Sequence, residues 1–300
     1  MTEILVTGAA GKTGRAVTSA LVCRGVTVRA MVRPNSTSPV LDHSAVRRVP
    51  ADLATGQGLD VAMKGVTGVY VIAPNVDDSE VDMVRHVVES AVAQRVPRIA
   101  YHSVLHPDDA SMPHHLRKAR AERLIRDRRP GATVLRPSAY QQNLLGAALS
   151  GDLVVPYSLD AVFTNVDLGD VAEVAARVLT EDGHAGATYE LAGPERQTTR
   201  DLAAIASQVL GHDVYSRRIT MGEWEAGPGD ALSERERQEL GAMFTAYDRD
   251  GFAGDPARLR SLLGRPAGRW ADILRRSRDG RDANSESTDR CASVVDAAGR

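Results

Sequence analysis

Short apolar runs rich in β-branched residues alternate with helical segments through the first half of the chain, and this alternation limits the possible folds most strongly. The runs lie at residues 3–7, 26–32, 46–52, 68–74, 97–104 and 131–137. Among them lie helical patterns at residues 12–23, 81–95 and 114–129. Largely apolar strands separated by helices are typical of a parallel sheet covered on both faces. We therefore predict an α/β fold with a doubly wound parallel sheet.

The pattern becomes shorter after about residue 150, where brief strands precede a helix that begins after Asp167 and a strand over residues 187–195. We expect residues 1–150 to form the sheet domain. Residues 151–277 are expected to form a smaller α/β lobe with C-terminal helices, interleaved with the first domain. Residues 278–300 are polar and poor in aromatic side chains, which is typical of a disordered tail.

Three glycines, Gly8, Gly11 and Gly14, separate the first strand from the first helix. In a dinucleotide-binding turn such glycines permit a tight turn, a close approach of the backbone to the pyrophosphate and close packing of the helix, whose N-terminus attracts the phosphates. Gly11-Lys12-Thr13 also resembles the end of a triphosphatase loop. That loop needs four residues between its glycines, whereas two separate Gly8 from Gly11. We therefore predict a Rossmann-type domain that binds NAD(P).

Arg33, directly after the second strand, bears on the choice of cofactor. NAD sites normally carry a carboxylate here to bind the ribose hydroxyls. An arginine favours the 2′-phosphate of NADP, although an ordinary exposed arginine is the alternative. We predict NADP, with NAD as the second choice. Asp52 and Leu53, at the end of the third strand, are expected to flank the adenine.

Several motifs together resemble the NmrA-like group of atypical short-chain dehydrogenases/reductases over roughly residues 3–215: VTGAAGKTG, AMVRP, ADL, VIAP, IAYHSV, HHLRKARAE and LRPSAYQQNL. The resemblance implies an NAD(P)-binding Rossmann domain with a smaller C-terminal substrate lobe. It also implies an activity, because members of the group are quinone reductases or redox sensors without turnover. The residues that we assign to the cofactor are Gly8, Ala10, Gly11, Lys12, Thr13, Gly14, Arg33, Asp52, Leu53, Ala73, Pro74, Asn75, Ser103 and Lys118.

Lys118 and His114 are the candidate catalytic residues. Classical members of the superfamily use Tyr-x-x-x-Lys, in which the lysine binds the nicotinamide ribose and lowers the pKa of the tyrosine. Lys118 matches the lysine, but His114 stands at the tyrosine position, which argues against classical carbonyl reduction. A reduced quinone is a stabilised phenolate that water or His114 can protonate. Only Lys12, Lys64 and Lys118 are lysines, and two of them fall in the proposed site, where a compact charge is needed.

Four histidines, His102, His106, His114 and His115, lie within fourteen positions that begin in the fifth strand. A metal site is not expected, because His106 precedes a proline and the adjacent His114 and His115 should point apart. Tyr140 and Asn143 follow the sixth strand, where a substrate would meet the nicotinamide, although capping and packing of the next helix is an alternative role. The residues that we expect to contact the substrate are Tyr140, Asn143, His102 and His106.

We expect an NAD(P)H-dependent oxidoreductase that reduces a quinone-like or polycyclic aromatic carbonyl compound. The alternative is an NAD(P)-binding redox sensor or regulator without turnover. A composition rich in alanine and arginine suits a bacterium with GC-rich DNA. There such a reductase would serve aromatic natural-product biosynthesis, including as the reductase component of an oxygenation step.

The bulk composition favours small molecules as partners. A net charge of −2 gives no general reason to expect nucleic acid or a membrane. The N-terminal residues show no signal-peptide pattern, and no window is apolar enough to cross a membrane. We expect a cytoplasmic monomer or homodimer whose partner is a small aromatic or quinone substrate.

Overall fold

The computed structural model describes residues 2–280. The expected tail over residues 278–300 therefore lies almost entirely outside the described residues. Within residues 2–280, none of the helices combines the length and the apolar character that crossing a bilayer requires.

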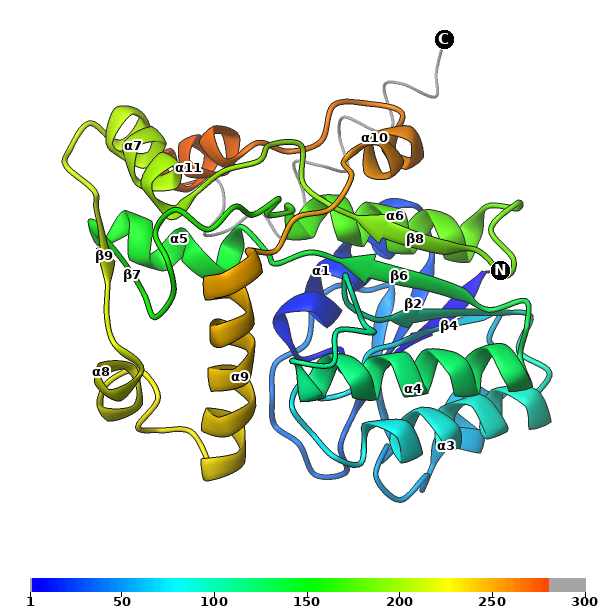
Figure 1. Cartoon of the computed structure of the whole chain (residues 1–300). Helices are drawn as coiled ribbons and strands as arrows, with labels where there is room; N and C mark the ends of the chain where they lie inside the picture. The colour runs from blue at the N-terminus through cyan, green and yellow to red at the C-terminus, as the bar shows by residue number, and fades with distance from the viewer. Residues whose placement is uncertain (1, 281–300) are drawn as a thin grey trace, which may run out of the picture.

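Seven strands form the central sheet in the order β3-β2-β1-β4-β5-β6-β8 (Figure 1). Every neighbouring pair is parallel. The order is that of a Rossmann fold with one added strand, which confirms the predicted doubly wound class. The strands are β1 (Glu3–Val6), β2 (Thr27–Val32), β3 (Val46–Pro50), β4 (Gly68–Val71), β5 (Arg98–His102), β6 (Thr133–Pro137) and β8 (Thr188–Leu191).

Successive strand residues pack into two separate cores, one on each face of the sheet. Ile4 and Val6 belong to the core under α1 (Lys12–Cys23) and α6 (Leu168–Thr180). Leu5 and Val69 belong to the core under α2 (Leu59–Met63), α3 (Glu80–Ala93) and α4 (Pro113–Arg128). Because side chains alternate along a strand, apolar residues at every position require helices on both faces. Figure 1 shows α3 and α4 on the opposite side of the sheet from α6.

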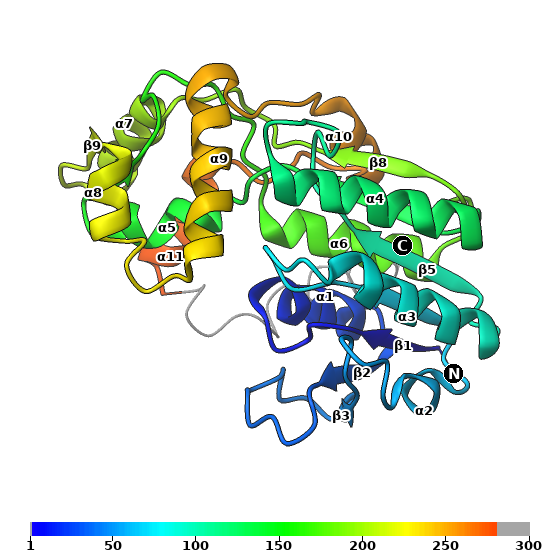
Figure 2. The ribbon, with the colours of Figure 1, turned by 60° about the horizontal axis from the view of Figure 1, so that its bottom comes forward.

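The lobe is built on a two-stranded parallel sheet with helices around it. Trp270 is fully buried in its core, and the indole Nε1 donates to the carbonyl of Leu202 at 3.0 Å. In Figure 2, α9 stands between α8 and the sheet domain. The remaining elements are β7 (Asp152–Val155), β9 (Tyr215–Arg218), α5 (Gln142–Leu149), α7 (Thr199–Leu210), α8 (Met221–Ala226), α9 (Glu234–Asp250), α10 (Ala257–Leu263) and α11 (Trp270–Arg278).

Two elements expected in the lobe belong to the sheet domain instead. The strand predicted over residues 187–195 is β8, which pairs with β6 at the edge of the large sheet. The helix before it, α6, packs against α1 and contributes to the sheet-domain core. Because α6 and β8 form another helix–strand unit, they continue the parallel series, and the excursion through β7 only interrupts it.

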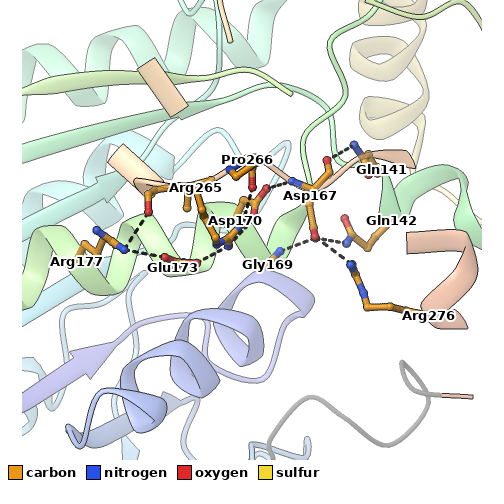
Figure 3. A network of polar contacts seen from close by, with 12 residues as sticks. Gln141, Gln142, Asp167, Gly169, Asp170, Glu173, Arg177, Arg265, Pro266 and Arg276 are labelled. Atoms are coloured by element: carbon orange, nitrogen blue, oxygen red, sulfur yellow. Dashed lines mark hydrogen bonds and ion pairs between the residues drawn. The ribbon is translucent and has the colours of Figure 1, made fainter. Parts of the chain in front are cut away.

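Asp167 and Asp170, at the start of α6, contact both α11 and the segment before it, as Figure 3 shows. The Oδ1 atom of Asp167 accepts the backbone N–H of Gly169 at 2.8 Å, which confirms the helix start expected after Asp167. Its Oδ2 atom pairs with Arg276 at 3.1 Å. Asp170 pairs with Arg265 at 2.8 Å. These buried carboxylates fix α11 and the segment before it to the helix that supports the sheet.

Candidate active site

The turn between β1 and α1 has the geometry that its three glycines predict. Gly8 adopts a φ of +59°, in the left-handed region that favours glycine, and its carbonyl accepts the Gly11 N–H at 3.0 Å. A Cβ atom on Gly14 would lie 2.2 Å from the Gly8 carbonyl oxygen. α1 begins at Lys12 with no acidic side chain in its first turn, so no carboxylate opposes a phosphate there. The turn therefore fits a dinucleotide pyrophosphate.

A cavity of about 610 Å³ lies between this edge of the sheet and the lobe. The carboxyl ends of the parallel strands meet here, which is where ligands bind in open α/β sheets. Of the predicted site residues, those that line the cavity are Lys12, Thr13, Ala73, Asn75, His102, Ser103, His114, Lys118, Tyr140 and Asn143.

The other predicted residues do not line it. Arg33 is exposed after β2, and Asp52 and Leu53 are half-buried after β3, so they lie at the same sheet edge but beside the cavity. His106, expected to contact the substrate, is exposed, and its Nε2 atom lies 3.0 Å from the carbonyl oxygen of Ala253. Four members of the glycine turn also lie outside the lining, namely Gly8, Ala10, Gly11 and Gly14. Pro74, after β4, does not line the cavity either.

An aromatic wall, which no sequence pattern predicts, forms the lobe side of the cavity. Its rings contact one another with centroids 5.0 to 6.0 Å apart. The members are Tyr157, Phe163, Trp224, Phe244, Tyr247 and Phe252. The chain has three phenylalanines in all, and each belongs to this wall. The confinement of these scarce residues to positions 163–252 is the sequence feature that could have indicated the wall.

Lys118 is held by a buried carboxylate that the sequence motifs do not indicate either. Its Nζ atom lies 2.7 Å from Oε1 of Glu80, the first residue of α3. The hydroxyl of Tyr101 donates to the same oxygen at 2.8 Å. The side chain of Glu80 is 1% exposed and that of Lys118 is 9% exposed. Because such a pair is shielded from water, removing either partner would be costly, and Glu80 fixes the position of the lysine.

His114 and His115 do not point apart. Their ring centroids are 4.5 Å apart in an edge-to-face arrangement at the start of α4. Burial, followed by the charge of its neighbour His115, lowers the pKa of His114 to about 3. Burial also lowers the pKa of His115 to about 4, against the backbone contact with His106. Both imidazoles are therefore neutral near pH 7.

Two further contacts connect the start of α1 to the segment after β6. The Nζ atom of Lys12 donates to Oδ1 of Asn143 at 2.6 Å, and burial lowers the pKa of Lys12. The hydroxyls of Thr13 and Tyr140 lie 3.4 Å apart. Ser103 lines the cavity, but its hydroxyl donates to the buried Glu122 at 2.5 Å. The expected cofactor and substrate residues therefore adjoin one another at one end of the cavity.

The described part of the chain offers no set of side chains that could bind a metal ion. The described residues 2–280 contain no group of three or more histidine, cysteine, aspartate or glutamate side chains that could hold an ion.

The chain has clear relatives among characterised proteins. It is 28% identical over 281 residues to quinone oxidoreductase 2 of Escherichia coli, covering 90% of this chain and 97% of that protein. It is 29% identical to a (4-alkanoyl-5-oxo-2,5-dihydrofuran-3-yl)methyl phosphate reductase of Streptomyces griseus, covering 90% and 95%. The crystal structure of an NADPH-dependent quinone oxidoreductase from E. coli, complexed with NADPH, superposes with a TM-score of 0.79 at 26% identity, covering 90% of this chain and 98% of that one. The NmrA-like family model matches residues 1–258, so the chain belongs to the NmrA-like family.

Proposed function

We propose that this protein uses NADPH to reduce quinone-like or polycyclic aromatic carbonyl compounds. At the coarser level it is an NAD(P)H-dependent oxidoreductase. The observation that carries the proposal is that the start of α1 and the aromatic wall line one cavity. A planar ring stacked on that wall would lie within the same enclosure as the nicotinamide. The reductases among its relatives support this class of reaction.

NADPH is the cofactor that the site residues fit best. The glycine turn accepts the pyrophosphate, and exposed Arg33 at the end of β2 is free to meet a 2′-phosphate. Asp52 and Leu53 would border the adenine from the end of β3. NADH lacks the 2′-phosphate, so we expect it to bind more weakly.

The chemistry is mainly one of positioning. When bound, the cofactor supplies a hydride. Lys118, fixed by Glu80, would donate its remaining hydrogens to the nicotinamide ribose, and the wall would orient the acceptor ring. We expected His114 as an alternative to water in protonating the reduced product, but its imidazole is neutral near pH 7, so we assign this protonation to water.

The same chemistry would suit the reduction of an aromatic intermediate in natural-product biosynthesis. It would also suit the reductase component of an oxygenation step, in which the reduced ring goes on to react with oxygen. The composition, rich in alanine and arginine, supports a bacterial setting of this kind.

Turnover of purified protein with NADPH and a panel of benzo-, naphtho- and anthraquinones tests the proposal. We expect the nicotinamide absorbance to fall with one or more quinones, and Lys118→Met to slow that loss by at least about tenfold. Lys64→Met is the matched control, because Lys64 is exposed at the end of α2 and should not affect the rate. Cofactor binding without turnover across the panel would instead indicate a redox sensor.

A further inference from the structure

Three polar side chains form a continuous hydrogen-bonded chain from inside the sheet to the cavity. The hydroxyl of Tyr70, on β4, lies 2.7 Å from Nδ1 of His102, at the end of β5. The hydroxyl of Tyr140 lies 2.7 Å from Nε2 of the same imidazole. Tyr140 and His102 line the cavity, whereas Tyr70 is fully buried beneath it and does not.

These hydrogen bonds have a donor-to-acceptor direction, because a neutral imidazole carries hydrogen on only one nitrogen. Desolvation, followed by the charge of Lys118, lowers the pKa of His102 to about 3, so the ring is neutral near pH 7. If Nδ1 carried the hydrogen, the buried Tyr70 hydroxyl would have to turn its own hydrogen away from the one partner found for it in the described chain. An unsatisfied buried donor is unfavourable. The favoured tautomer therefore has Nδ1 accepting from Tyr70 and Nε2–H donating to Tyr140.

The consequence falls on the hydroxyl of Tyr140. Its oxygen already accepts the hydrogen of His102, so its own hydrogen is left to point elsewhere. The Thr13 hydroxyl, at 3.4 Å, is well beyond the usual 2.7–2.8 Å of an O–H···O bond and competes weakly. Burial raises the pKa of Tyr140, which keeps the hydroxyl protonated. A protonated donor at the cavity surface is thus fixed in direction by groups behind it.

We propose that Tyr140 is a catalytic hydrogen-bond donor to the substrate oxygen that becomes negatively charged, and that His102 and Tyr70 are positioning residues that direct its hydroxyl. This inference rests on the proposed function. The hydride brings its electron pair to the quinone, the charge collects on one oxygen, and that oxygen accepts from Tyr140. Water then protonates it. The tyrosine would supply what the Tyr-x-x-x-Lys motif lacks at His114, from a different element of the fold.

Nitrogen NMR on wild-type protein labelled with ¹⁵N-histidine tests the direction of the hydrogen bonds at His102. The resonances of His102 are assigned by their loss in His102→Gln. We expect a protonated Nε2 and an unprotonated Nδ1 near pH 7. The opposite tautomer would overturn the inference, because the hydroxyl of Tyr140 would then donate back to His102.

Single-turnover hydride transfer from NADPH to 1,4-naphthoquinone tests the catalytic role. We expect Tyr140→Phe to slow transfer about 100- to 1,000-fold, the range typical of removing one donor to a developing oxyanion, with NADPH affinity unchanged. Tyr70→Phe should slow it about three- to tenfold although Tyr70 cannot touch the substrate, because Nδ1 is then free to take the hydrogen. His102→Gln, which can still donate towards Tyr140, should retain more activity than His102→Leu.

Tyr189→Phe is the matched control. Its hydroxyl also binds a histidine, Nδ1 of His184 at 2.9 Å, but neither residue lines the cavity, so transfer should be unchanged. Wild-type turnover with full activity in Tyr140→Phe would overturn this inference and leave the proposed function intact. A wild type that shows no turnover with any quinone would contradict the proposed function itself. The NMR result would still decide the direction of the hydrogen bonds at His102.

Discussion

In the wall of the cavity, a buried ion pair lies near neutral imidazoles, and both depend on the exclusion of water. Glu80 and Lys118 form a buried ion pair, in which each side chain is the counter-charge of the other. For His102 and His114, burial has the largest effect on the pKa, and it keeps both imidazoles neutral near pH 7. The free energy of unfolding should therefore fall when Glu80 is removed, and also when the histidines become protonated.

Removing Glu80 should be costly, because the ammonium of Lys118 would remain buried without a counter-charge. We expect Glu80→Ala to lower the free energy of unfolding by about 3–5 kcal/mol in urea titrations. The double variant Glu80→Ala/Lys118→Met should recover at least half of that loss. Glu181→Ala, which breaks the more exposed pair with Arg24, should cost less than about 1 kcal/mol. Equal losses in the two single variants would show that Glu80 is not acting as a buried counter-charge.

The buried imidazoles predict a loss of stability in mild acid. Their folded-state pKa values, about 3 for His102 and His114 and about 4 for His115, lie below the ordinary value of 6.5. The unfolded chain therefore binds more protons, and stability that is complete above pH 6.5 falls as the pH drops towards 4. At pH 5.5 each such histidine should cost about 1.4 kcal/mol relative to pH 7.5.

The readout for this prediction is the difference between variants, because Asp170, whose pKa is raised by burial, acts in the opposite direction. Urea unfolding at pH 7.5 and 5.5 should show a pH effect about 1.4 kcal/mol smaller in His114→Phe than in wild type. His212→Asn, at an exposed site, should leave the pH effect unchanged. An unchanged pH effect in His114→Phe would contradict the assigned neutral state.

Among the elements, the turn from β1 into α1 has the least freedom. Gly14 lies against the Gly8 carbonyl, so any side chain must push α1 away from the turn. The tight turn was predictable from sequence because glycine spacing is a local signal. The orientation of His114 and His115 was not, because the side chains in the first turn of α4 pack on neighbours such as Phe252 from distant segments.

Gly14→Ala tests this element. We expect the clash to lower NADPH affinity by at least about tenfold and to lower the free energy of unfolding, as overpacking typically costs 1–3 kcal/mol. Calorimetric titration and urea unfolding measure the two effects. Gly146→Ala is the control, because a Cβ atom there meets nothing within 4 Å and lies inside α5, where alanine should stabilise by up to about 1 kcal/mol. Undiminished affinity in Gly14→Ala would show that the turn does not hold the cofactor.

At the scale of the whole molecule, the substrate cavity depends on how α9 is held against the sheet domain. Arg117, on α4, pairs with Glu239, on α9, and both are buried. Arg117 also lies 3.3 Å from Asp78, which pairs with Arg235 at the start of α9. Because α9 carries Phe244 and Tyr247 of the aromatic wall, this cluster of ion pairs fixes the wall relative to Lys118.

Glu239→Ala should therefore loosen substrate binding more than cofactor binding. We expect the KM for 1,4-naphthoquinone to rise several-fold, because Arg117 loses its buried partner and α9 is less firmly held. The NADPH dissociation constant should stay within about twofold, since the glycine turn is a separate contact. Steady-state kinetics and calorimetry measure these values, with exposed Glu234→Ala as the control. Parallel changes in both constants would argue against a separate role for α9.

The sequence was informative where a function depends on neighbours in the chain and less so where it depends on the fold. The sheet class, the glycine turn and the helix start after Asp167 follow from local patterns. The aromatic wall contains residues between positions 157 and 252, and the Glu80–Lys118 pair connects two helices. Because both features join residues that are distant in sequence, no local pattern predicts either. β8 was misplaced because the lobe strand β7 interrupts the series before it.

Calorimetric titration of wild-type protein with NADPH and NADH tests the central claim most directly, because every proposed role depends on a dinucleotide held by the glycine turn. The account predicts saturable binding of NADPH at micromolar concentrations and weaker binding of NADH. No measurable heat with either nucleotide at millimolar concentration, from protein shown to be folded, would contradict it.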